Sequence, residues 1–226
     1  MARIPVLVLC DDLWHPAEVI ERGLAALPQE KYAFSVVRTV KDILTPARLA
    51  AYPMTICCKS NCVNQANPAP WFEPGVTEVM PEDFEQYIRQ GYGFLAIHSG
   101  LVYRDDMCPA MSRLLGSAFH GHPPRCEVHW QPAQPEHPIV RDVQPFSCRD
   151  EHYQITLTCN EKPFLTSTSP SGGTQPAGFA RSLGAGRLCA LTPGHTLDVW
   201  EHPMFQRLLL NAMAWCLKED EPCEQS

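Results

Sequence analysis

The chain has 226 residues and a formal net charge of −7, with 45% hydrophobic and 19% charged residues. This composition excludes extensive disorder, because a chain of this length and apolar content can bury a sizeable core. The acidic balance argues against nucleic acid or an anionic membrane as a partner, since no basic patch is present to replace their counterions.

The start of the sequence and the cysteines predict a cytoplasmic location. The apolar run that ends at Cys10 meets two aspartates directly, so it is too short for a signal peptide. No stretch reaches the ~18 apolar residues of a membrane span. We therefore expect the eleven cysteines to be reduced and mostly buried. Cys57, Cys58 and Cys62 form the only cluster, but they lack the Cys-x-x-Cys spacing of a structural zinc site.

In the first half of the chain, predicted strands alternate with predicted helices. The continuous apolar run at 4–10 is typical of a central parallel strand that is covered on both faces. Helices are predicted over 16–27 and 81–90, and strands over 34–40, 54–58 and 93–98.

The second half begins with a helix over 106–116 that ends on a glycine cap. Residues 119–151 are rich in proline and histidine and predict short strands and loops. Further strands are expected over 153–158, 164–169 and 186–192, followed by an amphipathic helix over 203–217. Residues 1–218 are then expected to form a single domain and 219–226 a frayed acidic tail.

This alternation predicts an α/β fold with a mostly parallel central sheet, in which ligands bind beyond the carboxyl ends of the strands. Polar side chains follow four of the predicted strands at that end: His15, Lys59 with Asn61, His98 and His195. We therefore expect these side chains to gather on one rim of the sheet.

His98 stands at a sharp turn after a predicted strand, where many α/β enzymes place a nucleophile. The Gly-x-Ser-x-Gly pattern of serine hydrolases is absent around Ser99, and the residue at the turn is not a cysteine. A hydrogen-bonded core histidine is the alternative interpretation of His98. A cysteine hydrolase that uses Cys58 or Cys62 is a further alternative.

Nine histidines raise the possibility of a metal site. His120 and His122 are two residues apart on an extended segment and should face the same side, although a solvated turn explains them equally well. Zinc can bind three such nitrogens and keep an open position for a water molecule. His195 follows a strand end and is a better functional candidate than His137 or His202, which are expected to form a turn and a helix cap.

Two adjacent carboxylates, Asp150 and Glu151, precede His152. Like charges this close raise the pKa of one carboxyl group, which suits a general acid or base. The alternative is a solvated loop.

Several of these segments, taken in order, resemble the ThuA-like (trehalose utilisation) family over nearly the whole chain. The matching segments are GFLAIHSG at 93–100, GSAFHGHP at 116–123, HPIV at 137–140, DEHY at 150–153 and GRLCALTPGH at 186–195. The resemblance implies a fold similar to class I glutamine amidotransferases, a flavodoxin-like three-layer sandwich. Those enzymes carry a cysteine where this chain has His98, so glutaminase chemistry is excluded.

The resemblance also implies a role in the catabolism of trehalose, related disaccharides and their 3-keto derivatives. We therefore expect an isomerase or hydrolase that acts on a sugar or 3-keto-sugar by acid–base chemistry, with or without zinc or another divalent transition metal. The alternative is a non-catalytic sugar-binding or regulatory protein. Homodimerisation through proline-rich loops is a further expectation.

Roles in this site are assigned to a small set of residues. The expected catalytic residues are His98, His195 and Glu151, and the candidate metal ligands are His15, His98, His122 and His195. Lys59, Asn61 and Gln175 are expected to hydrogen-bond sugar hydroxyls, and Trp71 or Trp200 to stack on a sugar ring.

Overall fold

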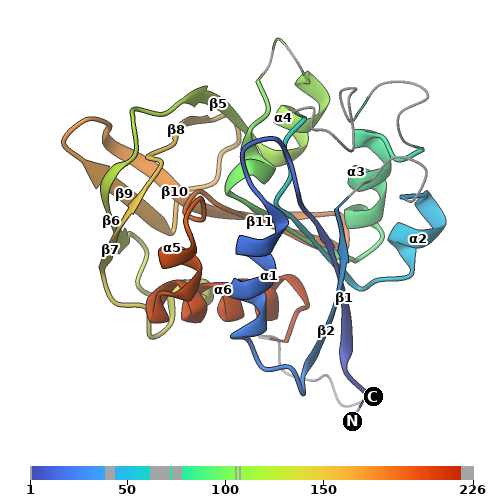
Figure 1. Cartoon of the computed structure of the whole chain (residues 1–226). Helices are drawn as coiled ribbons and strands as arrows, with labels where there is room; N and C mark the ends of the chain where they lie inside the picture. Colours follow the sequence, from blue (N-terminus) through green and yellow to red (C-terminus); the bar gives the residue numbers. More distant parts are fainter. Residues whose placement is uncertain are drawn as a thin grey trace.

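A nine-stranded sheet forms the frame of the protein (Figure 1). The computed structural model describes residues 2–38, 44–61, 72, 78–104, 106 and 108–219. Across the sheet, the strands are β2 (Tyr32–Val37), β1 (Ile4–Leu9), β3 (Met54–Cys57), β4 (Gly93–Ile97), β11 (Gly186–Leu191), β10 (Gly173–Leu183), β9 (Leu165–Ser169), β6 (Cys126–Pro132) and β7 (Phe146–Asp150).

The first five strands in that order are parallel neighbours, with the 2-1-3-4-5 order of flavodoxin-like folds. The sequence of β1 is apolar without interruption because both faces of this strand are buried. Val6 and Val8 belong to the hydrophobic core on one face of the sheet, and Leu7 and Leu9 belong to the core on the other face. The prediction of a central strand buried on both faces is confirmed.

The other four strands extend the sheet with antiparallel pairs. The longest of them, β10, was not predicted, because its sequence lacks apolar alternation and its pairing with β9 shifts register between Pro176 and Gly178. A separate two-stranded sheet pairs β5 (Ser117–Gly121) with β8 (Gln154–Leu157).

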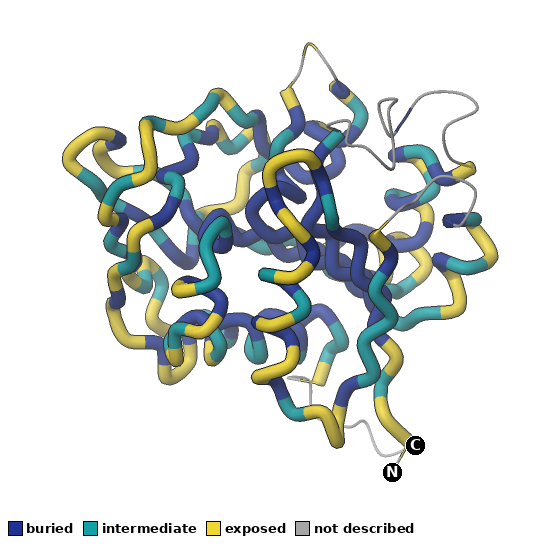
Figure 2. The backbone as a smooth tube through the Cα atoms, in the orientation of Figure 1, coloured by how far each residue is buried: buried dark blue, intermediate teal, exposed yellow. Residues whose placement is uncertain are grey.

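Helices cover both faces of the parallel half and make it a three-layer α/β sandwich, as expected. One core includes Leu24, Trp200 and Leu208 from the helices on its side, and the other includes Phe84 and Met111. The first face carries α1 (Ala17–Ala25), α5 (Leu197–Glu201) and α6 (Pro203–Cys216), and the second carries α2 (Pro46–Ala50), α3 (Pro81–Arg89) and α4 (Pro109–Leu115). Figure 2 shows the buried strands between the exposed outer turns of these helices.

Two of the predicted structural histidines are confirmed. The Nδ1 atom of His137 accepts a hydrogen bond from the backbone of Ile139 at the start of a short 3₁₀ helix (Pro138–Val140), and the Nδ1 atom of His202 accepts one from Met204 at the start of α6. Helices α2 and α5 were not predicted, since five residues are too few to display a helical period.

The nine cysteines in the described residues are all free, and six of them are buried. No helix in this part of the chain is long and apolar enough to cross a membrane. Of the predicted tail at 219–226, only Glu219 is described, and it pairs with Lys31 at 2.7 Å. Cys62 and Trp71, which were considered as a nucleophile and a stacking residue, lie outside the described residues.

Candidate metal and acid–base site

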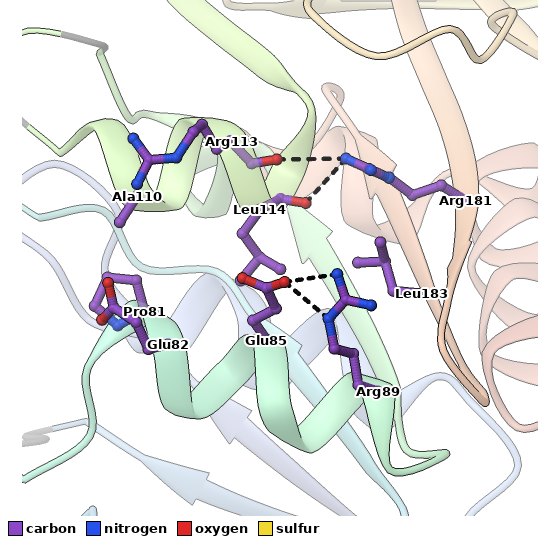
Figure 3. A pocket seen from close by; sticks show the side chains of 9 residues that line it. All are labelled: Pro81, Glu82, Glu85, Arg89, Ala110, Arg113, Leu114, Arg181 and Leu183. Atoms are coloured by element: carbon purple, nitrogen blue, oxygen red, sulfur yellow. Dashed lines mark hydrogen bonds and ion pairs between the residues drawn. The ribbon is translucent and has the colours of Figure 1, made fainter.

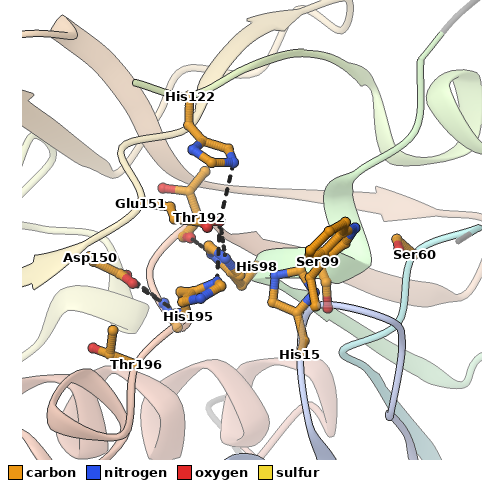
Figure 4. Close-up of polar contacts among 12 residues, drawn as sticks. His15, Ser60, His98, Ser99, His122, Asp150, Glu151, Thr192, His195 and Thr196 are labelled. Atoms are coloured by element: carbon orange, nitrogen blue, oxygen red, sulfur yellow. Dashed lines mark hydrogen bonds and ion pairs between the residues drawn. The ribbon is translucent and has the colours of Figure 1, made fainter. Parts of the chain in front are cut away.

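Four side chains from distant parts of the sequence converge beyond the ends of strands β1, β4, β7 and β11 (Figure 4). His15, His98, Glu151 and His195 each offer one nitrogen or oxygen atom, and these four atoms all lie within 4.8 Å of one another. We call these four residues the His/Glu cluster. The structure thus brings together three of the four histidines that the sequence proposed as ligands, and it adds Glu151.

His98 occupies a strained turn directly after β4, at the start of a 3₁₀ helix (His98–Leu101). Its φ of 48° lies in the left-handed region, which is uncommon for non-glycine residues and which recurs at active sites. The turn fits tightly, because a Cβ atom on Gly100 would collide with the carbonyl oxygen of Cys57. Ser99 is buried and donates to the carbonyl oxygen of Cys58 at 2.6 Å, so its hydroxyl is already engaged.

The proton on His98 can be placed from its contacts. Nδ1 lies 2.7 Å from the carbonyl oxygen of Thr192, which can only accept, so Nδ1 carries the hydrogen and Nε2 keeps a lone pair. Burial lowers the pKa of His98 to about 4, although Glu151 acts in the opposite direction. The imidazole is therefore neutral near pH 7. It also stacks on Tyr153, with ring centroids 4.0 Å apart.

His15 is oriented by Asp12 in a similar way. Nδ1 of His15 lies 2.6 Å from Oδ1 of Asp12, and the other carboxylate oxygen accepts from the backbone and hydroxyl of Ser60 at 3.0 and 2.8 Å. Burial by itself would raise the pKa of Asp12, but the contacts with His15 and Ser60 outweigh it and hold the pKa well below its usual range. The ionised Asp12 accepts a hydrogen bond from the N–H at Nδ1 of His15. Nε2 of His15 therefore carries the lone pair, and it is buried without a hydrogen-bond partner among the described residues.

His195 is positioned through its backbone by Asp150. The Asp150 carboxylate accepts from the N–H groups of Gly194 and His195 at 2.9 and 3.1 Å. On the other side of this turn, the indole of Trp200 donates to the carbonyl oxygen of Gly194 at 2.8 Å. Burial raises the pKa of Asp150 to about 7. Nδ1 of His195 is also buried, and it makes no hydrogen bond of good geometry with the described residues although it lies close to Glu151.

Glu151 is the centre of the arrangement. Its Oε2 atom lies 3.3 Å from Nε2 of His98, 3.2 Å from Nδ1 of His195 and 3.4 Å from Nε2 of His122. Burial opposes ionisation of Glu151, but the contacts with His195 and His98 hold its pKa below the usual range. His122 is more exposed than the three histidines of the His/Glu cluster: 35% of its side chain is exposed, against 2% for His98. It approaches Glu151 from the solvent side.

The residues fit a metal ion. Because Nδ1 of His98 donates to the carbonyl oxygen of Thr192, Nε2 of His98 turns a lone pair toward Oε2 of Glu151 at 3.3 Å, and a proton or a metal cation between the two atoms would stabilise this arrangement. Nε2 of His15 is buried and has no hydrogen-bond partner among the described residues, while the buried Nδ1 of His195 lies 3.2 Å from Oε2 of Glu151 without good hydrogen-bond geometry. Imidazole nitrogens and carboxylate oxygens are common ligands of divalent transition metals, and outer groups such as Asp12 orient metal-binding histidines in known sites. The His/Glu cluster could therefore hold a metal ion.

A cavity of about 550 Å³ opens next to the cluster. Its volume is within the ~300–1,000 Å³ of small-molecule sites. His15, Glu151 and His195 form part of its wall together with His122, so the cluster is accessible to a small ligand. The rest of the wall consists of Trp14, Ser60, Val102, Phe119, Arg125 and Tyr153.

A second cavity, of about 370 Å³, lies between α3, α4 and β10 (Figure 3). Two of the arginines that line it already make hydrogen bonds or ion pairs with other groups of the protein. Arg89 pairs with Glu85 at 2.8 Å, and Arg181 donates to the carbonyl oxygens of Arg113 and Leu114 at the end of α4. We assign no function to this cavity.

Of the residues that were expected to bind sugar, the four that the structure describes do not line the cavity near the cluster: Lys59, Asn61, Gln175 and Trp200. Lys59 has no exposed surface and donates to the carbonyl oxygen of Asp11 at 2.6 Å, and burial lowers its pKa. Trp200 is likewise fully buried. Asn61 accepts from the backbone of Phe72, and Gln175 donates to the carbonyl oxygen of Gly172. The positions of Lys59 and Asn61 after a strand were read from the sequence, but the directions of all four side chains depend on packing.

Two alternatives from the sequence are weakened. Burial raises the pKa of the Cys58 thiol well above its usual value, so this cysteine is not a thiolate nucleophile at neutral pH. His120 and His122 do not act as a pair, because the β5 ladder shifts register between Phe119 and Gly121. His120 contacts the hydroxyl of Thr156 at 2.8 Å, and only His122 reaches Glu151.

The sequence analysis missed the supporting roles of Asp12 and Asp150. For Asp12, the signal was its spacing of three residues before His15, which allows a carboxylate and an imidazole in one tight loop to meet. For Asp150, no local signal was available, since its partners lie more than forty residues further along the chain.

Comparisons with known proteins agree with this architecture. The family model for ThuA, described as trehalose utilisation, matches residues 6–216. A ThuA-like protein from Parabacteroides merdae is similar in structure, with a TM-score of 0.74, 15% identity and coverage of 100% of this chain and 93% of that chain. A ThuA-like protein from Bacteroides uniformis has a TM-score of 0.73 and 18% identity, with coverage of 95% and 91%.

A β-galactosidase from Rahnella sp. R3 shares the fold over 98% of this chain but only 32% of its own, with a TM-score of 0.62 and 16% identity. At these identities, the similarity to solved structures shows the fold alone. No curated protein sequence matches the chain. The match to the family model, in contrast, spans almost the full length, and the chain therefore belongs to the ThuA (trehalose utilisation) family.

Proposed function

We propose that this protein is an enzyme of carbohydrate metabolism that acts on a sugar or 3-keto-sugar by acid–base chemistry at a metal centre. Membership of the ThuA family supports the carbohydrate-related role. The observation that carries the catalytic part is the His/Glu cluster, in which the lone pair on Nε2 of His98 faces the Glu151 carboxylate and the buried Nε2 of His15 has no hydrogen-bond partner among the described residues.

In this proposal His15, His98, Glu151 and His195 hold the metal, which is zinc or another divalent transition metal. When bound, such an ion would polarise a carbonyl or hydroxyl oxygen of the sugar. Two of these ligands are oriented by hydrogen bonds on the side of the ring away from the metal: Nδ1 of His15 donates to Asp12, and Nδ1 of His98 donates to the carbonyl oxygen of Thr192. These outer contacts fix which nitrogen of each ring is free.

Proton transfer is assigned to His122 together with Glu151. His122 is partly exposed at the cavity wall, and its Nε2 atom lies 3.4 Å from Glu151, so it can exchange protons with both solvent and substrate. Histidine is suited to this role because its ordinary pKa lies near neutral pH. The pair would take a proton from the carbon next to a keto group, or give one to a leaving oxygen. These two steps correspond to an isomerase and a hydrolase.

The proposal also includes location and assembly. Free and mostly buried thiols are compatible with a reducing cytoplasm. Homodimerisation remains a prediction that size-exclusion chromatography can test.

Elemental analysis of the tag-free protein tests the metal centre, with His98→Ala and His195→Ala beside it. We expect about one equivalent of a transition metal in the wild type and its loss from both variants. His120→Ala is the matched control, because this exposed histidine contacts Thr156 and should leave the metal content unchanged. The absence of metal from the wild type, or its retention in both variants, would refute the metal centre.

A non-catalytic sugar-binding protein is the second candidate, favoured by one observation. The strained turn that usually presents a nucleophile carries a buried, neutral histidine. Incubation with trehalose and a 3-keto-glucoside between pH 5 and 9 separates the two candidates. An enzyme forms product with a bell-shaped or stepped pH profile, whereas a binding protein gains thermal stability without product.

A further inference from the structure

Trp14 stands out among the tryptophans that the structure describes. It is 66% exposed, while Trp130, Trp200 and Trp215 are at most 9% exposed. Its side chain makes no hydrogen bond or ring contact with any described residue, and yet it forms part of the wall of the cavity beside the His/Glu cluster. Together with the neighbouring Leu13, which is 51% exposed, it forms exposed apolar surface beside a ligand-sized cavity.

The backbone that carries Trp14 is fixed by the same carboxylate that orients the neighbouring histidine. Oδ1 of Asp12 accepts from the backbone N–H of Trp14 at 3.0 Å and from that of His15 at 3.0 Å, in addition to the imidazole of His15. Asp11 holds the end of the same loop, because its side chain accepts from the backbone of Ala17 at 3.1 Å. The fold therefore fixes the backbone position from which the indole of Trp14 extends beside the cluster.

We propose that Trp14 is the stacking platform that binds one face of a pyranose ring of the substrate, next to the His/Glu cluster. This inference rests on the proposed function. A pyranose ring presents apolar C–H groups on its faces and hydroxyl groups around its edge. The electron-rich face of an indole attracts the C–H face, while the hydroxyl edge needs polar partners. Ser60, His122 and Arg125 supply such partners on the same cavity wall.

Leu13 provides the contrast that makes the proposal testable. It is the other large hydrophobic residue that is exposed in the described structure, at 51%, but it does not line the cavity. If the exposed apolar surface served contact with a second copy of the chain, both residues would contribute. If Trp14 binds sugar, only Trp14 would.

The test is isothermal titration calorimetry of the metal-loaded protein with glucose, trehalose and a 3-keto-glucoside, using the wild type, Trp14→Ala, Trp14→Phe and Leu13→Ala, with tryptophan fluorescence recorded for the two proteins that keep Trp14. For the sugar that the wild type binds, we expect a shift of tryptophan emission to shorter wavelength and a Kd about tenfold weaker in Trp14→Ala. Trp14→Phe should recover most of the affinity, and Leu13→Ala should leave it unchanged. For any sugar that is turned over, KM should rise in Trp14→Ala while kcat changes little.

The possible failures are distinguishable. Equal Kd values for the wild type and Trp14→Ala would overturn the stacking role and leave the proposed function standing. The absence of binding by the wild type to all three sugars would overturn the sugar proposal and the stacking role together. A dimer that dissociates in both Trp14→Ala and Leu13→Ala, with unchanged sugar affinity, would assign this surface to a second copy instead. Metal analysis of Trp14→Ala must show the wild-type content, because a loss would mean that the substitution disturbs His15.

Discussion

The variant Asp12→Asn tests whether Asp12 orients His15 for metal binding, because it keeps His15 in place and changes only the group that contacts its Nδ1 atom. The Asp12 carboxylate is buried and accepts from five groups: the Nδ1 atom and backbone N–H of His15, the backbone N–H of Trp14, and the backbone N–H and hydroxyl of Ser60. An asparagine of the same shape keeps one acceptor oxygen and replaces the other by an NH₂ group. At least one backbone N–H therefore loses its partner.

The magnitude follows from these contacts. One buried donor without an acceptor costs about 1–3 kcal/mol, and the loss of the charge-assisted contact with His15 adds to it, so the free energy of unfolding should fall by ~2–4 kcal/mol. A neutral amide also no longer fixes the hydrogen on Nδ1 of His15. Groups that orient metal-binding histidines from behind contribute about 10- to 100-fold to metal affinity, and we expect a loss in this range.

Urea denaturation measures the first quantity, and competition with a chromogenic chelator measures the second. Asp106→Asn is the control, because Asp106 is an exposed carboxylate whose pairing with Arg104 lies at the surface, and both quantities should stay close to wild type. A variant that is destabilised as expected but binds metal as tightly as the wild type would refute the role of Asp12 in orienting His15.

Three further predictions concern the centre of the site. In the chelated protein, the pKa of His98 is about 4 when folded and ~6.5 when unfolded. The unfolded chain therefore binds more protons at this residue, and the contribution of His98 to the free energy of unfolding should fall by about 3 kcal/mol from pH 6.5 to 4. Asp150, whose pKa burial raises to about 7, contributes in the opposite direction over the same range. The His98 contribution is therefore measured as the difference between the wild type and His98→Gln in urea denaturation, and an equal pH dependence of the two proteins would contradict the burial of a neutral imidazole. Glu151→Gln should reduce turnover by about 10²-fold or more with little change in the melting temperature of the chelated protein, and near-normal turnover would remove Glu151 from the chemistry. Gly100→Ala should destabilise the protein by about 1–3 kcal/mol, because the added Cβ collides with the carbonyl oxygen of Cys57, and calorimetry would show an unchanged melting temperature if the turn has room.

The sequence by itself determined the parallel half of the fold. The strand at β1 is visible as an uninterrupted apolar run because both of its faces are buried, and α6 is visible because its apolar residues repeat with the helical period. These signals are local, since each is a property of a few consecutive residues. For the same reason the positions of His15, His98 and His195 at strand ends could be read directly, and the rule for parallel sheets placed them on one rim.

Only the tertiary structure decided how these side chains are used. Glu151 directly follows β7, and no local pattern in the sequence predicted how β7 pairs with β6. Glu151 contacts His98, which lies 53 residues earlier in the sequence. Packing turned Lys59 into the interior and left Trp14 in the cavity wall. The direction of a side chain at the end of a strand depends on which elements pack over it. That information is held in long-range contacts, and residue type and spacing do not contain it.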